Sequence, residues 1–120
     1  MNELDKLRTM LDDAGIPYES IQEERAEVPD FAKKMFGEAA KWTRNQVIYG
    51  GRVGDHWRWD GICQYGSYGA AKGMIETYGT LGWDKKHNPQ VMGAEDAFAV
   101  IAADWSTRRK KGENNEQTTS

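Results

Sequence analysis

Glycines and aromatic residues crowd the middle of the chain, and this crowding is the strongest constraint on its fold. Nine of the thirteen glycines lie between Gly50 and Gly82, and the segment from Trp57 to Trp83 reads WRWDGICQYGSYGAAKGMIETYGTLGW. Glycine permits tight turns and close backbone approach, whereas Trp and Tyr provide large flat faces with a polar tip. The region therefore disfavours long regular elements, and its aromatic residues either pack a core or line a binding surface.

The overall composition favours one soluble domain. The chain has 120 residues, 29% of them charged, and a formal net charge of −3; this length usually gives one hydrophobic core. The acidic balance supplies no general electrostatic reason to bind extended nucleic acid or anionic lipid. No apolar run approaches the roughly 20 residues that span a bilayer, and the first residues lack the order of a signal peptide. We therefore predict a cytoplasmic protein without a membrane partner.

Hydrophobic periodicity predicts three helices. The first covers residues 2–14, where Leu4, Leu7 and Leu11 recur at helical spacing, with Asn2 as its cap and Gly15 at its end. A second, shorter helix follows the proline at position 29, and a third begins near residue 94. The apolar face of the third helix consists of Phe98, Ile101, Ala102 and Trp105. Residues 109–120 have nothing apolar to bury, so we predict a single domain over residues 1–108 followed by a disordered polar tail.

Between these helices the sequence predicts antiparallel strands. Residues 42–49, WTRNQVIY, favour a strand, residues 50–55 are rich in turn formers, and residues 56–63 form the return strand of a hairpin. Alternation places Trp57, Trp59 and Cys63 on one face of the return strand, which is the expected core face. A third strand is expected at residues 74–78. A short edge strand is expected at residues 16–18, followed by a solvated connection at residues 22–27.

Together these elements define an α+β domain, in which N-terminal and C-terminal helices flank a small antiparallel sheet of three to four strands. The second face of so aromatic a sheet meets either water or a partner. A monomer, and a homodimer or larger homo-oligomer, are therefore both open.

Groups that could perform catalysis are few and form no signature. Cys63 is the only cysteine, and the histidines are His56 and His87. On one strand Cys63 and His56 would stand about 23 Å apart, at about 3.3 Å per residue, so a catalytic Cys63 would need His87. We interpret Cys63 as a buried structural thiol. Asp60 and Glu76 form either a general acid–base pair or, as we favour, structural cross-strand contacts. We predict no catalytic residues, no metal site, no cofactor and no enzyme activity.

The same central region carries the candidate binding residues. Residues 66–73, GSYGAAKG, weakly resemble a phosphate cradle but lack the spacing of a Walker loop. Aromatic faces with one or two cations suit a small nucleotide. The candidate ligand-binding or partner-binding residues are Trp57, Arg58, Trp59, Tyr65, Tyr68, Lys72, Tyr78 and Trp83. The basic run at residues 108–111 is interpreted as a solvated helix end.

Four segments resemble a family of small proteins encoded by phages and prophages of Gram-positive bacteria. They are LDKLRTMLDDAGIPYE at residues 4–19, NQVIYG at 45–50, ICQYGSYGAAKGMIETYG at 62–79 and GAEDAFAVIAADW at 93–105. The resemblance implies a mobile-element setting in a host cytoplasm and supplies no catalytic residues. The chain departs from similar sequences at Gly93, where they tend to carry a Ser or Thr cap.

Two functional hypotheses follow. The first is a non-enzymatic phage-type interaction protein that binds a host protein, such as an anti-CRISPR-like inhibitor of a defence factor or an inhibitor of a regulatory factor. The acidic residues that would present its negative face are Asp12, Asp13, Glu19, Glu23, Glu24 and Glu27. The alternative is a small-ligand binder that sequesters a nucleotide or a nucleotide-derived signal in an aromatic–glycine pocket. Extended nucleic acid is not an expected partner of either.

Overall fold

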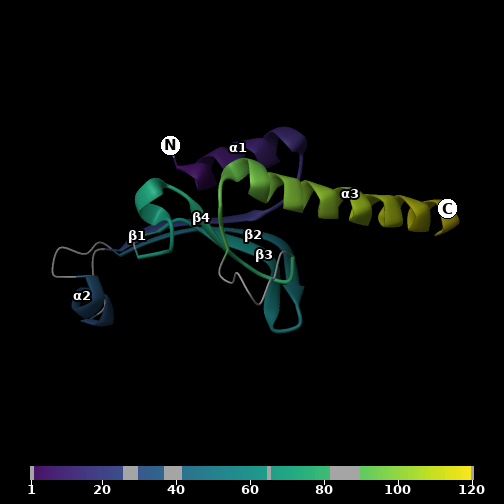
Figure 1. Ribbon diagram of the computed structural model, residues 1–120. Coiled ribbons are helices and arrows are strands. Elements are labelled where there is room, and N and C mark those ends of the chain that lie inside the picture. Colours follow the sequence, from purple (N-terminus) through teal and green to yellow (C-terminus); the bar gives the residue numbers. More distant parts are fainter. Residues whose placement is uncertain (1, 26–29, 37–41, 65, 82–89, 120) are drawn as a thin grey trace.

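Helices cover one face of a five-stranded antiparallel sheet in this computed structural model (Figure 1). The structure describes residues 2–25, 30–36, 42–64, 66–81 and 90–119, with the backbone alone for residues 24, 25, 32, 36, 42, 43 and 112–119. The strands are β1 (Glu19–Arg25), β2 (Trp42–Val53), β3 (His56–Ile62), β4 (Ile75–Tyr78) and β5 (Gln90–Met92). The helices are α1 (Glu3–Ala14), α2 (Asp30–Phe36), the 3-10 turn η1 (Ala70–Lys72) and α3 (Ala94–Thr119). The predicted α+β class is confirmed, with five strands in place of three to four.

The first helix, α1, has the boundaries that its sequence predicts. Its side chains Leu4, Leu7 and Leu11 are fully buried, which confirms the apolar stripe read from their spacing. The side-chain oxygen of Asn2 accepts a hydrogen bond from the main chain of the first turn at 2.8 Å. Gly15 ends the helix with a φ of +70°, a left-handed conformation that glycine adopts without steric cost.

The central hairpin is longer than the sequence predicts. Strand β2 does not stop at residue 49 but continues to residue 53, through Gly50 and Gly51, which have φ angles of +84° and +71°. The pairing register with β3 shifts between Tyr49 and Arg52, so the two glycines form a bulge inside the ladder. The turn itself shrinks to residues 54–55. The turn-forming residues 50–55 therefore contain a bulge followed by a turn, and their composition does not distinguish the two.

Both edges of the sheet differ from the prediction. The edge strand is not at residues 16–18; β1 runs instead from Glu19 to Arg25 and pairs with β2 from Glu19↔Ile48 to Arg25↔Trp42. The expected solvated connection at residues 22–27 is thus largely strand. Edge strands are held by main-chain hydrogen bonds and tolerate charged side chains, so polar composition does not exclude them. At the other edge, β5 is only three residues long, too short for a periodic signal.

The core lies between α1, α3 and the helix-facing side of the sheet. Its buried apolar residues are Leu4, Leu7, Leu11, Ile16, Val47, Tyr49, Trp59, Cys63, Ile75, Ala94, Ala97 and Ile101. Trp59 is 1% exposed, so the prediction that its face of β3 packs the core is confirmed. Trp57, near the hairpin tip, is half-buried, and the Arg52 guanidinium lies 4.3 Å from the centre of its ring.

The start of α3 is capped by a residue from the other end of the chain. The Glu3 side chain, in α1, accepts a hydrogen bond from the main-chain N–H of Ala94 at 3.1 Å. A Cβ at Gly93 would lie 2.8 Å from the same Glu3 oxygen, so glycine leaves room for this carboxylate. Because the first N–H groups of a helix need external acceptors, Glu3 takes the place of the missing Ser or Thr cap.

We expect Glu3→Ala to lower the free energy of unfolding by about 1 kcal/mol, the usual effect of removing a helix cap. Gly93→Ser, introduced into the Glu3→Ala protein, should recover most of that loss because serine supplies a local acceptor. The same Gly93→Ser change in the native protein should bring no gain. Urea unfolding of the four proteins measures this, and equal effects of Gly93→Ser in both backgrounds would contradict the capping role.

Two helical segments extend away from the sheet at opposite ends of the molecule (Figure 1), whose extents are 60 × 30 × 23 Å. At one end is α2, which matches the predicted second helix and exposes 55% of Phe31 and 70% of Met35. At the other end α3 continues to Thr119, where the sequence predicts a disordered tail from residue 109. No apolar residue follows Trp105 in the sequence.

Candidate functional site

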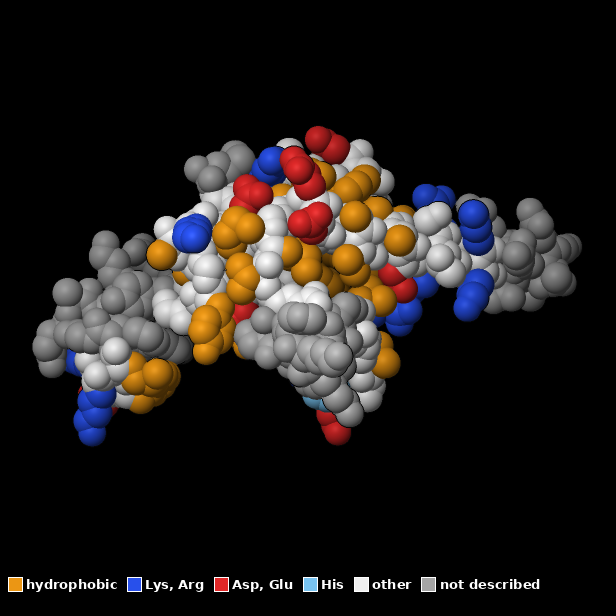
Figure 2. Space-filling model, viewed as in Figure 1, with side chains coloured by type: hydrophobic (Ala, Val, Ile, Leu, Met, Phe, Trp, Pro, Cys, Tyr) orange, Lys and Arg blue, Asp and Glu red, His pale blue; other side chains and the backbone are white. Residues whose placement is uncertain are grey.

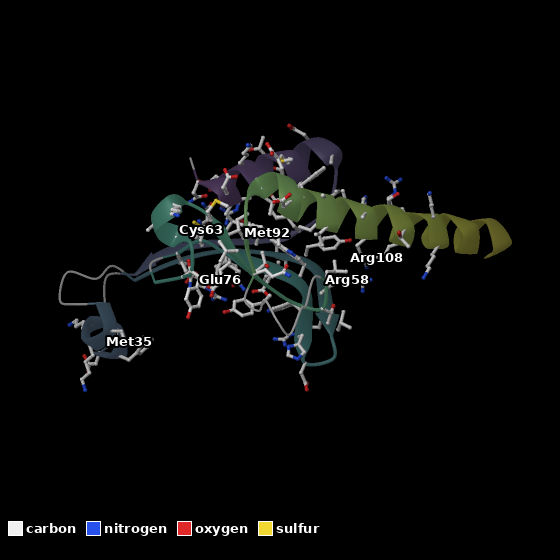
Figure 3. All side chains as sticks on the ribbon, viewed as in Figure 1. Met35, Arg58, Cys63, Glu76, Met92 and Arg108 are labelled. Carbon is white, nitrogen blue, oxygen red and sulfur yellow. The ribbon has the colours of Figure 1, made fainter. Side chains whose placement is uncertain are left out.

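The face of the sheet opposite α1 and α3 carries buried polar side chains. Cross-strand register pairs Asp60 with Tyr78 and Ile62 with Glu76, and Gln46 with Ile62, so all five side chains lie on this outer face. Gln46, Asp60 and Glu76 are each at most 9% exposed, and Figure 3 shows Glu76 on the side away from the helices. Buried ionisable groups cluster at functional sites, so this outer face is the first candidate site.

Asp60 is held in a short chain of hydrogen bonds. The Gln46 amide nitrogen donates to Asp60 Oδ2 at 3.0 Å, and Arg44 donates to the Gln46 amide oxygen at 3.0 Å. Burial raises the pKa of Asp60, with the Gln46 hydrogen bond opposing the shift. The ionised form therefore weakens the fold: the penalty is absent below the unfolded pKa of about 4 and complete once the pH exceeds the raised folded value.

Glu76 has a different partner. The Tyr78 hydroxyl donates to Glu76 Oε1 at 2.9 Å, and burial together with this bond raises the pKa of Tyr78 to about 12. Asp60 and Glu76 are diagonal neighbours on β3 and β4, with Cα atoms about 7–8 Å apart. Each carboxylate thus has its own hydrogen-bond donor. The donor to Asp60 lies on the neighbouring strand β2, as the cross-strand interpretation expects, whereas the donor to Glu76 lies on its own strand.

Three exposed side chains lie beside these buried acids. Tyr68 is 65% exposed, Tyr78 37% and Val91 44%. Val91 pairs with Glu76 and Tyr78 with Asp60, so both lie on the outer face. A Cβ at Gly69 would lie 2.6 Å from a methyl carbon of Val91, so the loop that carries Tyr68 packs on β5. We call Tyr68, Tyr78 and Val91 the outer sheet patch.

The structure separates most of the eight residues predicted to form one binding site. Trp59 is in the core and Trp57 stacks with Arg52 at the hairpin tip. Arg58 turns toward α3, and Lys72 is exposed on η1. Tyr65 and Trp83 lie outside the described residues. Of the described residues in the set, Tyr68 and Tyr78 belong to the outer sheet patch.

Arg58 joins the sheet to α3 through Asp104, a residue that the sequence did not single out. Its Nε and Nη2 donate to the two oxygens of Asp104, both at 2.9 Å, and the Tyr49 hydroxyl donates to Oδ2 at 2.7 Å. A Cβ at Gly50 would lie 2.8 Å from Arg58 Cβ, so the glycine bulge gives the arginine its path to the helix. These bonds, chiefly that from Arg58, hold the pKa of Asp104 below its usual range.

We expect Asp104→Asn to lower the free energy of unfolding by about 2 kcal/mol at pH 7, the usual range for hydrogen bonds to a charged group. Because the folded pKa of Asp104 is depressed, its contribution is present above the unfolded pKa of about 4 and lost as pH falls through the folded value. The difference between the native and variant proteins should therefore shrink below pH 4. Urea unfolding from pH 7 to pH 3 measures it, with exposed Asp13→Asn as the control, and a pH-independent difference would contradict the charge pairing.

Cys63 and His56, which were considered for catalysis, lie at opposite ends of β3. Cys63 is buried, which raises the pKa of its thiol, and His56 begins the strand that ends just before it. His87 lies outside the described residues. Within those residues no three His, Cys, Asp or Glu side chains form a group that could hold a metal ion, and no described helix is long and apolar enough to cross a membrane.

Charge is distributed unevenly over the helices. Figure 2 shows acidic side chains gathered over α1 and basic side chains over the C-terminal half of α3. Of the residues expected to form an acidic face, Asp12, Asp13, Glu19 and Glu23 are exposed. The Glu24 side chain and Glu27 lie outside the described residues.

Comparison with known proteins adds no further assignment. No protein-family model, no curated protein and no solved structure matches the chain. The resemblance to phage-encoded proteins thus stays an expectation, and function is argued from the surfaces described above.

Proposed function

We propose that this chain is a non-enzymatic interaction protein that binds a protein partner through the outer sheet patch. The observation that carries the proposal is the exposure of Tyr68, Tyr78 and Val91. Strand register puts Tyr78 and Val91 on the sheet face away from α1 and α3. Tyrosines are enriched among the residues that dominate binding energy at protein interfaces, because they combine a large apolar area with a hydrogen-bonding tip. The buried acids Asp60 and Glu76 beneath the patch favour a partner with a basic rim.

The phage-type resemblance extends this proposal to the partner. A protein from a mobile element acts in the cytoplasm of its host, so the partner we propose is a host defence or regulatory factor whose activity falls on binding, as with an anti-CRISPR. A second copy of the chain is the competing occupant of the same patch. Light scattering at micromolar concentration separates the two, because a self-association patch gives at least a dimer mass.

The test is affinity capture from a Gram-positive bacterial lysate with matched variants. Tagged native protein, Tyr68→Ala and Val53→Ala are used in parallel; Val53 is an exposed apolar residue at the hairpin tip and serves as the control. We expect one stoichiometric host protein with the native and Val53→Ala proteins and its loss with Tyr68→Ala. Urea unfolding confirms that Tyr68→Ala remains folded.

Other outcomes of the capture experiment would contradict the proposal or favour the alternative. Equal capture by all three proteins would exclude the outer sheet patch as the interface, and the absence of any stoichiometric protein would contradict the proposal. Heating the captured sample and examining the released small molecules by mass spectrometry tests the alternative, since a nucleotide without a protein would indicate a small-ligand binder.

A further inference from the structure

A groove on the helix side of the molecule combines aromatic rings with charge. It lies where α3 passes the start of β1 and the glycine bulge of β2, and its volume is about 260 Å³. Tyr18, Tyr49 and Trp105 contribute aromatic rings to its lining, and Glu19 and Arg108 contribute the charged groups. None of these five residues belongs to the set that the sequence singled out for binding a nucleotide.

The glycine bulge leaves this groove open. Pairing between β1 and β2 begins at Glu19↔Ile48, so the bulge at Gly50 and Gly51 extends beyond the end of the β1 ladder. Both glycines line the groove. The Arg58 side chain occupies the space beside Gly50, whereas nothing lies within 4 Å of a Cβ at Gly51. A ligand can therefore approach the main chain of β2 closely at this point.

Arg108 gives the groove an available positive charge. The Asp104 carboxylate already receives two hydrogen bonds from Arg58 and one from Tyr49. Arg108 Nη1 stands farther off, 3.9 Å from Asp104 Oδ2, and 41% of the Arg108 side chain is exposed. Its guanidinium has five N–H donors in a planar fork suited to phosphate. The Asp104 carboxylate that it approaches is already bonded to Arg58. Arg108 Nη1 also donates to the Tyr49 hydroxyl at 3.5 Å, and the guanidinium lies 5.9 Å from the centre of the Tyr49 ring. These contacts are longer than those of Arg58, so the Arg108 fork can turn toward an anion in the groove.

We propose that this groove binds a nucleoside monophosphate. Trp105 and Tyr18 provide faces on which the base stacks, Arg108 binds the phosphate, and the Glu19 carboxylate accepts hydrogen bonds from the N–H groups of the base. Stacking and charge act at different ends of such a ligand, which matches the mixed lining. A purely apolar ligand would not use the charges of Arg108 and Glu19, and inorganic phosphate would not use the rings. This inference does not depend on a partner at the outer sheet patch.

Calorimetric titration of the full chain tests the proposal. The probes are AMP and GMP, with adenosine, guanosine and inorganic phosphate as partial ligands. We expect saturable binding of AMP or GMP with a dissociation constant below about 1 mM, and at least roughly tenfold weaker binding of every partial ligand, because each loses a contact worth a tenfold factor or more.

Variants locate the binding. Arg108→Ala should weaken nucleotide binding at least roughly tenfold by removing its phosphate contact, and Trp105→Leu should weaken nucleotide and nucleoside alike. Lys111→Ala, which removes the same charge one turn further along α3, is the matched control and should change the affinity less than about threefold. Urea unfolding checks that the Trp105→Leu protein stays folded. If that variant unfolds, the Arg108→Ala protein alone tests the site.

Three results would overturn the inference. They are no saturable binding of either nucleotide, binding of inorganic phosphate as tightly as AMP and GMP, and equal losses in Arg108→Ala and Lys111→Ala. The last would show general attraction to the basic half of α3. Because these probes are pure compounds, the outcome is separate from capture of a protein by the outer sheet patch.

Discussion

Gly79→Ala should lower the free energy of unfolding by about 3 kcal/mol or more, the sum of a strained φ at about 1–3 kcal/mol and overpacking at about 1–3 kcal/mol. Gly79 has a φ of +112°, and a Cβ there would lie 2.8 Å from the carbonyl oxygen of Arg58 and from the Cα atom of Trp59. Both contacts are to main chain. Side chains can rotate away from an added methyl group, whereas these atoms belong to β3 and move only with the strand.

The surrounding hydrogen bonds prevent that movement. After β4 the chain turns along β3, where the N–H of Thr80 donates to the Trp57 carbonyl at 3.1 Å and the N–H of Leu81 to the Arg58 carbonyl at 2.8 Å. Moving Gly79 outward would break this pair. The substitution therefore disturbs the centre of the sheet rather than a surface turn.

Gly15→Ala is the matched control for this effect. Gly15 also has a positive φ, +70°, but nothing lies within 4 Å of an added Cβ, so the cost should be the conformational one alone, about 1 kcal/mol. Urea unfolding followed by circular dichroism measures both variants. Losses of similar size at the two sites would contradict the close main-chain contact at Gly79.

Trp59→Ala is the second substitution with a large expected effect, a loss of about 3–5 kcal/mol, as is typical for truncating a buried aromatic residue. Trp59 is 1% exposed, and the end of its indole ring would lie 2.5 Å from a Cβ on Gly61. The ring thus fills the space that this glycine leaves on the core face. Its removal opens a cavity next to Ile75 that the neighbouring strand cannot close.

Trp57→Ala should cost much less, about 1 kcal/mol, because Trp57 is half-buried and its defined contact is a stacking interaction with Arg52. If Trp59→Ala does not fold, Trp59→Phe keeps the comparison measurable in the same urea titration. Equal losses for the two tryptophans would contradict the assignment of Trp59 to the core and Trp57 to the hairpin tip. The two tryptophans lie two positions apart on β3, and strand alternation assigns both to the same face. The comparison therefore distinguishes the core residue from the half-buried one, which the sequence does not.

Helices and the central hairpin could be predicted because their signals are local. Leu4, Leu7 and Leu11 share one face of α1, and Ile101 lies on the predicted face of α3, because helical spacing alone determines those positions. Strand β1 could not be predicted in the same way. Its pairing with β2 is made by main-chain groups, which every residue carries, and its charged side chains resemble those of a loop.

The candidate sites were less accessible to sequence than the fold. The loop that carries Tyr68 packs on β5 through Gly69 and Val91, and Arg58 meets Asp104 across 46 residues of chain; neither contact has a sequence period. Arg108 was interpreted as a solvated helix end. The one usable signal was Trp105, three residues before Arg108, which puts a ring and a cation on neighbouring positions of a helix surface.

The bond between Glu3 and the start of α3 has a consequence for how the chain completes its fold. Every strand pairs with its neighbour in sequence, so the sheet can grow hairpin by hairpin as the polypeptide leaves the ribosome. The contact that joins α1 to α3 spans 91 residues and forms only after α3 has been synthesised. Until then the leucine face of α1 has no α3 to pack against. We expect the nascent chain to remain open, and exposed to proteases and chaperones, until α3 emerges.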